Sequence, residues 1–209
     1  GIHATLSDGG ILSADIAVAG IGVVPDSGLA QAAGLAVDDG VVVDHRMRSS
    51  DPAIFAIGDV AAQPGPMGRA MRCETWQNAN VSAAHAVAAI LGTAPPAAEA
   101  PWFWTDQYDL NVQLAGQTGP EADGARIVEQ RVGPQHNAAS EGRLFLVLDD
   151  NRLIGAAAVN AGREMSLCRR LITAGAVLPD ALLTAAAFDS RAARACLNPR
   201  PASARLIDA

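Results

Sequence analysis

The segment Ser49-Ser-Asp-Pro-Ala-Ile-Phe-Ala-Ile-Gly-Asp59 joins a turn, an apolar run and a terminal Gly-Asp pair. Its apolar run, Ile54–Ile57, predicts a short strand buried in a parallel sheet. Because Gly58 has no Cβ, the backbone at the strand end can approach a ligand closely. The carboxylate of Asp59 can then accept a hydrogen bond from a ligand hydroxyl. A Gly-Asp pair alone is more typical of a strand that ends at a helix cap.

The residues before this segment predict several short elements. Asp-Gly-Gly at residues 8–10 predicts a hairpin over Ala4–Ala14. Residues Asp15–Pro25 contain a near-continuous apolar run, which predicts a strand buried in a parallel sheet. Ser27–Gly34 suits a short helix with Asp26 or Ser27 as its cap and Gly34 as its end. Val41–Asp44 predicts a short strand.

Residues 48–100 predict a turn, a loop, a helix and a linker, in this order. Arg48–Pro52 has the composition of a turn, and Ala61–Gly68 that of a loop rich in Pro and Gly. Gln77–Leu91 has a helical pattern closed by Gly92. Thr93–Ala100 carries prolines and small residues, which predict a linker between two parts of the chain.

The remaining chain predicts strands followed by a helix. Asn111–Ala115 and Arg126–Arg131 alternate as strands do. A hairpin is expected around Asp149-Asp150-Asn151, and its two strands are Arg143–Leu148 and Leu153–Val159. Further elements are an amphipathic helix over Met165–Ala174, ended by Gly175, and a tail beyond Phe188 that contains Pro199 and Pro201 and is expected to fray.

Composition excludes several classes of function. The formal net charge of the 209 residues is −7, and all 15 basic residues are arginine. An acidic chain without a basic run does not suit nucleic acid or an anionic membrane. The apolar run Ala83–Leu91 is too short to span a bilayer, and no signal peptide is recognisable.

Cysteine and histidine are scattered along the chain. Cys73, Cys168 and Cys196 form no CxxC pair, which argues against a dithiol flavoenzyme and a zinc site. An odd, scattered count of cysteines favours a reducing compartment such as the cytoplasm. The four histidines are also too dispersed to predict a metal site.

Four segments, in this order, carry a resemblance to a known family. They are Gly20–Pro25, Ser49–Asp59, Arg72–Ala79 and Pro101–Asp109. Ser49–Asp59 resembles the second FAD-binding motif of pyridine-nucleotide flavoreductases, with Ser49 where Thr is usual. Together the four segments resemble the C-terminal portion of the FAD-dependent NAD(P)H:ferredoxin or rubredoxin reductases. Within that family the resemblance is to the putidaredoxin-reductase-like, oxygenase-coupled members. Asp26 departs from the Asn that usually follows the first segment.

The resemblance implies a set of cofactor-binding residues, with no catalytic side chain and no metal. In the family, the Gly-Asp pair lies along the ribityl chain, and the segment around Trp76 meets the pyrimidine edge and the nicotinamide side. The Pro101–Asp109 segment lies over the isoalloxazine, with Asp106 and Gln107 as further candidates there. Core packing is the alternative for Trp76, and ordinary interdomain packing for Trp104. The residues so implied are Gly58, Asp59, Glu74, Thr75, Trp76 and Trp104.

The implied fold class is α/β plus α+β. The later segment of a discontinuous, Rossmann-like FAD-binding domain is followed by a small C-terminal reductase domain of antiparallel strands and helices. The expected division is residues 1–20 as the end of an NAD-binding domain, 21–98 as FAD-binding segment and 99–209 as C-terminal domain. Arg163, Arg169 and Arg170 could form part of a partner surface, but a solvated helix face is the expectation for them.

The chain lacks the G-x-G-x-x-G fingerprints that bind FAD and NAD(P)H pyrophosphates, since Gly20-Ile-Gly ends in Pro25. We therefore expect a portion of a longer enzyme, without stoichiometric FAD or NADH oxidation of its own. The apolar strands around Val18 and Ile54 are expected to need partners in a second chain, or to rearrange.

The resemblance also implies partners. Electrons are expected to pass from NAD(P)H through FAD to a ferredoxin or a rubredoxin, and a homodimer is a further expectation. One alternative is a non-catalytic interaction or dimerisation module formed by the C-terminal domain. Another is a flavoreductase of the apoptosis-inducing-factor type with a different acceptor. The choice between NADH and NADPH stays open.

Overall fold

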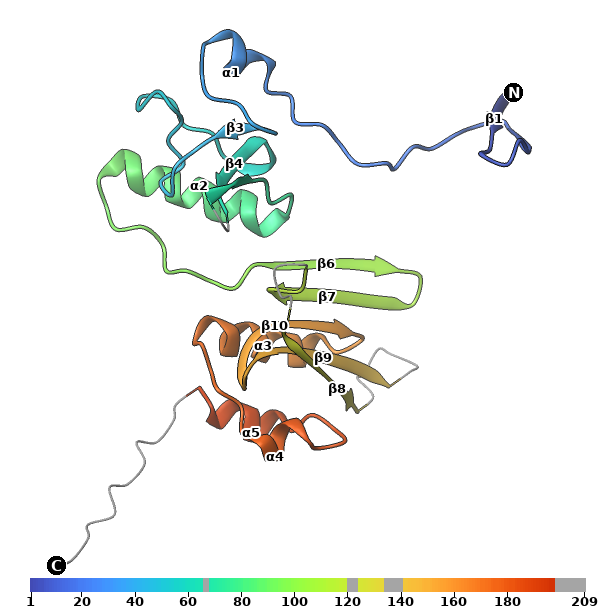
Figure 1. Cartoon of the computed structure of the whole chain (residues 1–209), viewed down its shortest axis with the longest axis vertical. Helices are drawn as coiled ribbons and strands as arrows, with labels where there is room; N and C mark the ends of the chain where they lie inside the picture. Colours follow the sequence, from blue (N-terminus) through green and yellow to red (C-terminus); the bar gives the residue numbers. More distant parts are fainter. Residues whose placement is uncertain (66–67, 120–123, 134–140, 198–209) are drawn as a thin grey trace, which may run out of the picture.

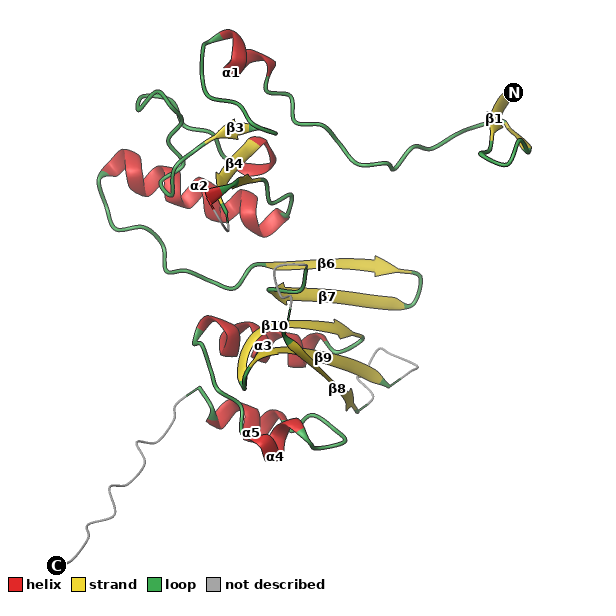
Figure 2. Cartoon of the chain, in the orientation of Figure 1, coloured by secondary structure: helices red, strands yellow, loops and turns green. Residues whose placement is uncertain are grey.

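The computed structural model describes residues 1–65, 68–119, 124–133 and 141–197. Figure 1 shows three successive parts: an N-terminal hairpin, a small α/β unit around the longest helix, and a C-terminal unit built on an antiparallel sheet. Figure 2 shows that the segments joining them are loops. Within the described ranges, no helix is long and apolar enough to cross a membrane.

The N-terminal hairpin is confirmed. Strands β1 (Ile2–Thr5) and β2 (Ile11–Ala14) pair antiparallel, and the N–H of Gly9 donates to the carbonyl of Leu6 at 3.0 Å. The strand predicted within Asp15–Pro25 is wrong, because this segment carries no strand. Val18 and Ile21 are each 93% exposed, and no described strand pairs with them. An apolar run becomes a strand only beside a partner that satisfies its N–H and C=O groups.

The small α/β unit has two layers. Its elements are α1 (Gly28–Ala32), β3 (Val41–Val42), η1 (Gly58–Val60), β4 (Ala61–Pro64), β5 (Ala70–Met71) and α2 (Trp76–Leu91). Strand β4 lies between β3, to which it is parallel, and β5, to which it is antiparallel. The core of the unit is formed by Val43, Met47, Ala61 and Ala86, so one face of α2 is packed against the sheet.

Two predictions for this unit are corrected. Ile54–Ile57 is not a buried strand: Phe55 makes a single bridge to Arg48, while Ile54 and Ile57 are 39% and 43% exposed. The loop predicted over Ala61–Gly68 begins instead with strand β4. Ala61 and Ala62 are fully buried where they pair with β3, so a tertiary pairing decides their conformation against the local Pro and Gly composition.

Helix α2 and the following linker are as predicted. The helix ends at Gly92, whose φ of +66° is the left-handed conformation that glycine adopts without a Cβ clash. The linker after it, residues 93–100, has no regular structure. The linker then leads directly into the first strand of the C-terminal unit.

The C-terminal unit is a five-stranded antiparallel sheet with helices. Its strands, in the spatial order β6-β7-β10-β9-β8, are β6 (Trp102–Gln107), β7 (Leu110–Gly116), β10 (Arg152–Val159), β9 (Gly142–Asp149) and β8 (Arg126–Val132). The predicted β9–β10 hairpin is confirmed. Helix α3 (Gly162–Thr173) packs on β7 and β10, and the buried side chains of Leu144, Leu146 and Met165 belong to the shared core.

Two short helices complete the unit, α4 (Asp180–Leu183) and α5 (Ser190–Ala195). The expected fraying beyond Phe188 is therefore wrong for α5. Asp189 caps this helix by accepting from the N–H groups of Arg191 and Ala192, and Ala193 is buried. Pro199 and Pro201 lie outside the described residues.

Candidate functional site

The candidate site begins where η1 meets the first turns of α2. Gly58 has a φ of +68°, and its N–H donates to the hydroxyl of Ser82 at 2.9 Å. Ser82 is 1% exposed within α2, so this bond fixes the Gly-Asp pair against the helix. Asp59 follows immediately and is exposed. The pair therefore presents a backbone with positive φ and an exposed carboxylate next to α2.

The start of α2 offers hydrogen-bond donors. Thr75 is its N-cap, and its side-chain oxygen accepts from the N–H of Asn78 at 3.1 Å. The Asn78 amide donates to the carbonyl of Cys73 at 2.8 Å and accepts from Gln63 at 2.9 Å, which fixes the entry into the helix. The first N–H groups of a helix, here at Trp76 and Gln77, have no intrahelical acceptor and carry partial positive charge. This end suits a negatively charged or electron-rich ligand edge.

All three tryptophans of the chain gather beside this helix end; we call Trp76, Trp102 and Trp104 the tryptophan cluster. Trp102 and Trp104 are stacked, with centroids 4.6 Å apart and planes at 24°. Trp76 meets Trp104 edge to face at 6.3 Å. Trp76 is 69% exposed and Trp104 37%, so neither behaves as a core aromatic. The fold thus brings two of the predicted site residues into contact across the linker.

The tryptophan cluster is tied to both units by polar contacts. The side-chain carbonyl of Gln77 in α2 accepts from the Trp102 N–H at 2.6 Å. The indole N–H of Trp102 donates to Gln113 in β7 at 3.2 Å. Neither glutamine stood out in the sequence, because a single Gln carries no pattern that marks a contact between distant segments.

The environment of Arg169 differs from the one expected from the sequence. Its guanidinium carbon lies 4.5 Å from the ring centroid of Trp102, and its Nη2 lies 3.6 Å from the Glu99 carboxylate. Its side chain is only 28% exposed, so the expectation of a solvated position on the helix is wrong for this residue. Arg163 and Arg170, in contrast, are exposed. Helical periodicity identified the core face of α3 but carried no information about the tryptophan that lies at its edge.

The other predicted residues lie nearby but are engaged locally. Glu74 forms an ion pair with Arg72, which also pairs with Asp39 at 3.3 Å. The hydrogen bond to Glu74 is the main reason that the pKa of Arg72 is raised, and Asp39 adds to the effect. Asp106 accepts from Asn111 at 2.7 Å across the β6–β7 turn. In the same strand, Gln107 donates to the Thr105 hydroxyl at 3.0 Å.

A cavity of about 440 Å³ opens next to the N-terminus of α2. Thr75 and Gln77 line it together with Arg72, Cys73 and Glu99. It is bordered by both units, because Pro101 and Gly116 belong to its wall. The helix start is therefore accessible to a ligand from the side of the linker.

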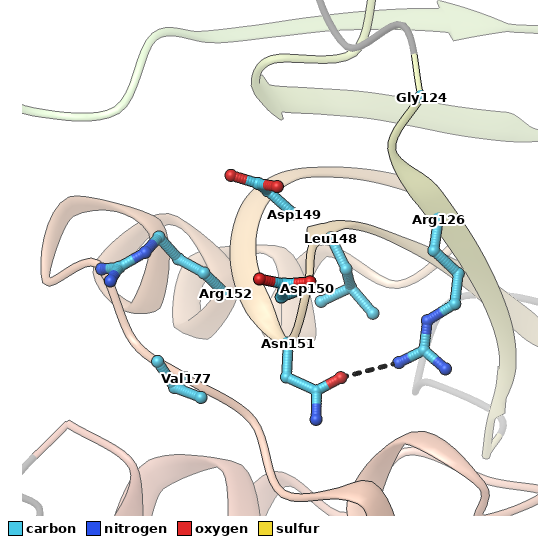
Figure 3. A pocket seen from close by; sticks show the side chains of 8 residues that line it. All are labelled: Gly124, Arg126, Leu148, Asp149, Asp150, Asn151, Arg152 and Val177. Atoms are coloured by element: carbon cyan, nitrogen blue, oxygen red, sulfur yellow. Dashed lines mark hydrogen bonds between the residues drawn. The ribbon is translucent and has the colours of Figure 1, made fainter.

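A second cavity, of about 830 Å³, lies beside the β9–β10 turn of the C-terminal unit (Figure 3). It is shaped by the turn of the β9–β10 hairpin, where Asn151 accepts from Arg126 at 2.9 Å. None of the residues predicted for the site lines it. The described residues also contain no cluster of three or more His, Cys, Asp or Glu that could hold a metal ion.

Two family models match this chain and account for its two units. The model of the pyridine nucleotide-disulphide oxidoreductases matches residues 1–83, and the reductase C-terminal model matches residues 102–194. The chain therefore belongs to the pyridine nucleotide-disulphide oxidoreductases that carry a reductase C-terminal domain. The family predicted from the four sequence segments is confirmed.

Relatives in this family are ferredoxin reductases of dioxygenase systems. The chain is 46% identical over 175 residues to the ferredoxin–NAD(+) reductase component of the anthranilate 1,2-dioxygenase system from Burkholderia cepacia, with 83% of this chain and 41% of the relative covered. It is 40% identical to the corresponding component of a 3-phenylpropionate/cinnamic acid dioxygenase from Photorhabdus laumondii, covering 80% and 40%. The chain thus spans less than half the length of these relatives.

Solved structures show the same fold. The covalent putidaredoxin reductase–putidaredoxin complex matches with a TM-score of 0.76 and 31% identity, over 93% of this chain and 45% of that one. The ferredoxin reductase for the CYP199A2 system from Rhodopseudomonas palustris matches with a TM-score of 0.73 and 32% identity, over 92% and 46%. The expected fold class, an α/β segment followed by an antiparallel reductase domain, is confirmed.

Proposed function

We propose that this chain supplies the later part of the FAD site and the C-terminal domain of a ferredoxin reductase that serves an oxygenase system. The packing of the Gly58–Asp59 pair against α2, beside the exposed tryptophan cluster, carries this proposal. The names of the relatives support ferredoxin as the electron acceptor. Rubredoxin is the alternative acceptor suggested by the sequence resemblance alone.

The residues present fit a flavin. Gly58 adopts a positive φ, and a Cβ placed there would have only Ala79 within 4 Å, at 3.9 Å, so the backbone itself is open to a ligand. We assign Gly58 and Asp59 to the ribityl chain, where the carboxylate accepts from a hydroxyl. Thr75 caps the helix start, where the N–H of Trp76 would be available to the pyrimidine edge. Trp104 would shield the ring from water.

Bound FAD would supply the redox chemistry, accepting a hydride from NAD(P)H and releasing single electrons. The residues of this chain bind, orient and shield. The partial positive charge at the start of α2 would stabilise negative charge on the pyrimidine of a bound flavin. Glu74, held by Arg72, is assigned to the nicotinamide side. No side chain of this chain need act as a nucleophile or general base in the proposed function.

The division of the chain follows from these assignments. We assign residues 1–20 to the end of an NAD-binding domain, 21–98 to the FAD-binding segment and 99–209 to the C-terminal reductase domain. The scattered cysteines favour a reducing, cytoplasmic setting. A homodimer through the C-terminal domain is part of the proposal.

FAD titration of the purified 209-residue chain tests the proposal. Because all three tryptophans lie at the site, FAD that binds there should quench their fluorescence saturably. Asp59→Asn should weaken this quenching, while Asp15→Asn, in the exposed N-terminal segment, should leave it unchanged. Quenching that rises linearly with FAD, or equally in Asp59→Asn, would contradict the assignment.

A desalting step adds the second half of the test. Since the chain lacks a pyrophosphate fingerprint, we expect FAD to be lost on desalting and NADH not to be oxidised. A retained flavin band that NADH bleaches would show a working reductase and refute this expectation.

An interaction module is the second candidate, favoured by the independence of the C-terminal core. Every residue of that core, from Ala115 to Ala193, and the partly buried residues packed on it belong to residues 102–197. Failure of FAD to quench the tryptophans, together with a dimer in sedimentation, would favour this function.

A further inference from the structure

Arg169 is placed at the meeting point of three segments. Its guanidinium carbon lies over Trp102 of β6, 4.5 Å from the ring centroid, within the range of a cation–π contact. Its Nη2 faces the carboxylate of Glu99, in the linker, at 3.6 Å. The residue itself belongs to α3, so one side chain joins a helix, a strand and the linker.

We propose that Arg169 is a positioning residue, which holds the tryptophan cluster in place between the α/β unit and the C-terminal sheet. Its Nε is buried without a hydrogen-bond partner among the described residues. The orientation of the guanidinium is therefore set by the indole plane and by Glu99. A cation held over the ring in this way restrains the position of Trp102 in turn.

The orientation of the Trp102 ring affects the other two tryptophans, and through them the start of α2. Trp102 stacks on Trp104 at 4.6 Å, and Trp104 contacts Trp76 at 6.3 Å. A tilt of the first ring therefore changes both contacts. Trp76 is the first residue of α2, so the orientation set by Arg169 extends to the helix N-terminus.

Further hydrogen bonds between the described parts of the two units run through Gln77 and the linker. Gln77 bonds to the backbone at Ala100 and Trp102 at 3.4 Å and 2.6 Å. From the other side, Thr173 of α3 accepts from the N–H of Ala100 at 3.0 Å. Because the linker has no regular structure, α3 restrains its end through Thr173 and Arg169. Loss of Arg169 removes the cation from the Trp102 ring, which is then held by its packing on the C-terminal core and its bond to Gln113.

The positioning role concerns the protein without FAD. Its consequence for the flavin, a fixed pair of rings beside the isoalloxazine, rests on the proposed function. Circular dichroism of the flavin-free chain separates the two, because failure of FAD to bind would leave this measurement unaffected.

Circular dichroism is the direct test, because stacked indoles couple their transitions. The chain contains only the three tryptophans of the cluster, so any exciton couplet reports their geometry without background from other tryptophans. We expect Arg169→Ala to reduce the couplet to about half or less, since the stacking geometry is directional. Arg169→Lys, which keeps a cation over the ring but lacks the planar fork, should give an intermediate amplitude.

Arg170→Ala is the matched control, because Arg170 is the exposed neighbour on the same helix. It should leave the couplet unchanged. An unaltered couplet in Arg169→Ala, or an equal loss in Arg170→Ala, overturns the proposal. Should Arg169→Ala fail to fold, Glu99→Gln carries the test: a weakened couplet supports the role of Arg169, and an unchanged couplet overturns it.

Discussion

The backbone N–H of Gly58 donates a 2.9 Å hydrogen bond to the hydroxyl of Ser82, a residue 24 positions later that is buried in α2. The same hydroxyl donates to the carbonyl of Ala79 at 3.1 Å, so it both donates and accepts. The bond fixes the turn that presents Asp59 at the start of the candidate site. The buried hydroxyl of Ser82 therefore links the packing of α2 to the conformation of the Gly58–Asp59 turn.

Removal of this hydroxyl leaves the Gly58 N–H unpaired. We expect Ser82→Ala to lower the free energy of unfolding by about 0.5–1.5 kcal/mol, the net value of a typical hydrogen bond, because the Gly58 N–H is only partly buried. Urea denaturation measures the change. Ser166→Ala is the control, because the Ser166 hydroxyl is exposed and bonds to the carbonyl of Gly162, in its own helix, at 3.3 Å. Equal effects of the two variants would show that the Gly58 bond contributes nothing.

Loss of the N-cap Thr75 should destabilise the N-terminal end of α2, which lies at the candidate site. Thr75→Ala removes the oxygen that accepts from the Asn78 N–H, at a cost of about 1 kcal/mol. Thr75→Ser keeps the oxygen and should recover most of the loss. Thermal unfolding followed by far-ultraviolet circular dichroism provides the comparison. A Thr75→Ser variant as unstable as Thr75→Ala would argue that the Thr75 methyl group, not its oxygen, stabilises the helix.

A side chain at Gly155 has no room in the sheet. A Cβ there would overlap the backbone carbonyl of Gln117, next to the irregularity in the β9–β10 register. We expect Gly155→Ala to cost about 1–3 kcal/mol, because the strand must shift to relieve the overlap. Gly20→Ala is a suitable control, since nothing lies within 4 Å of a Cβ at that position. Chemical denaturation of both variants tests the prediction, and equal midpoints would contradict it.

The three cysteines should differ in reactivity. Burial, with a smaller contribution from Glu164, raises the pKa of Cys168 to about 12. Its thiolate is therefore not populated near neutral pH, whereas Cys73 and Cys196 are only half-buried. We expect a thiol reagent to modify two cysteines in the folded chain and the third only after unfolding. Mass spectrometry identifies the protected site, and early labelling of Cys168 would contradict the buried position.

Because the pKa of Cys168 is raised, the free energy of unfolding should depend on pH in the alkaline range. The ordinary thiol pKa of 9.0 applies to the unfolded chain, and the folded value is about 12. Between these values the unfolded state loses its proton first, so the folded state loses stability as pH rises. The slope approaches about 1.4 kcal/mol per pH unit for one thiol. Cys168→Ala should flatten this dependence, and an unchanged slope would exclude the thiol as its cause.

Local patterns predicted some elements correctly and missed others, among them helix α5. The Asp-Gly-Gly turn, helix α2 with its terminal Gly92, and the β9–β10 hairpin depend on short-range chemistry, which the residues themselves encode. The apolar runs at Asp15–Pro25 and Ile54–Ile57 misled, because their hydrophobicity predicts burial without supplying the neighbouring strand. Strand β4 was missed for the opposite reason, since its pairing with β3 is parallel and non-local.

The order of four sequence segments determined the family of this protein. These segments also named six candidate cofactor-binding residues, namely Gly58, Asp59, Glu74, Thr75, Trp76 and Trp104. Only the tertiary structure decided that Ser82 fixes the Gly-Asp turn, that the three tryptophans meet, and that Arg169 stacks on Trp102. The physical reason is the range of the interactions. Turns and caps are formed between near neighbours, whereas a stacked ring or a buried hydroxyl finds its partner only when distant segments pack together.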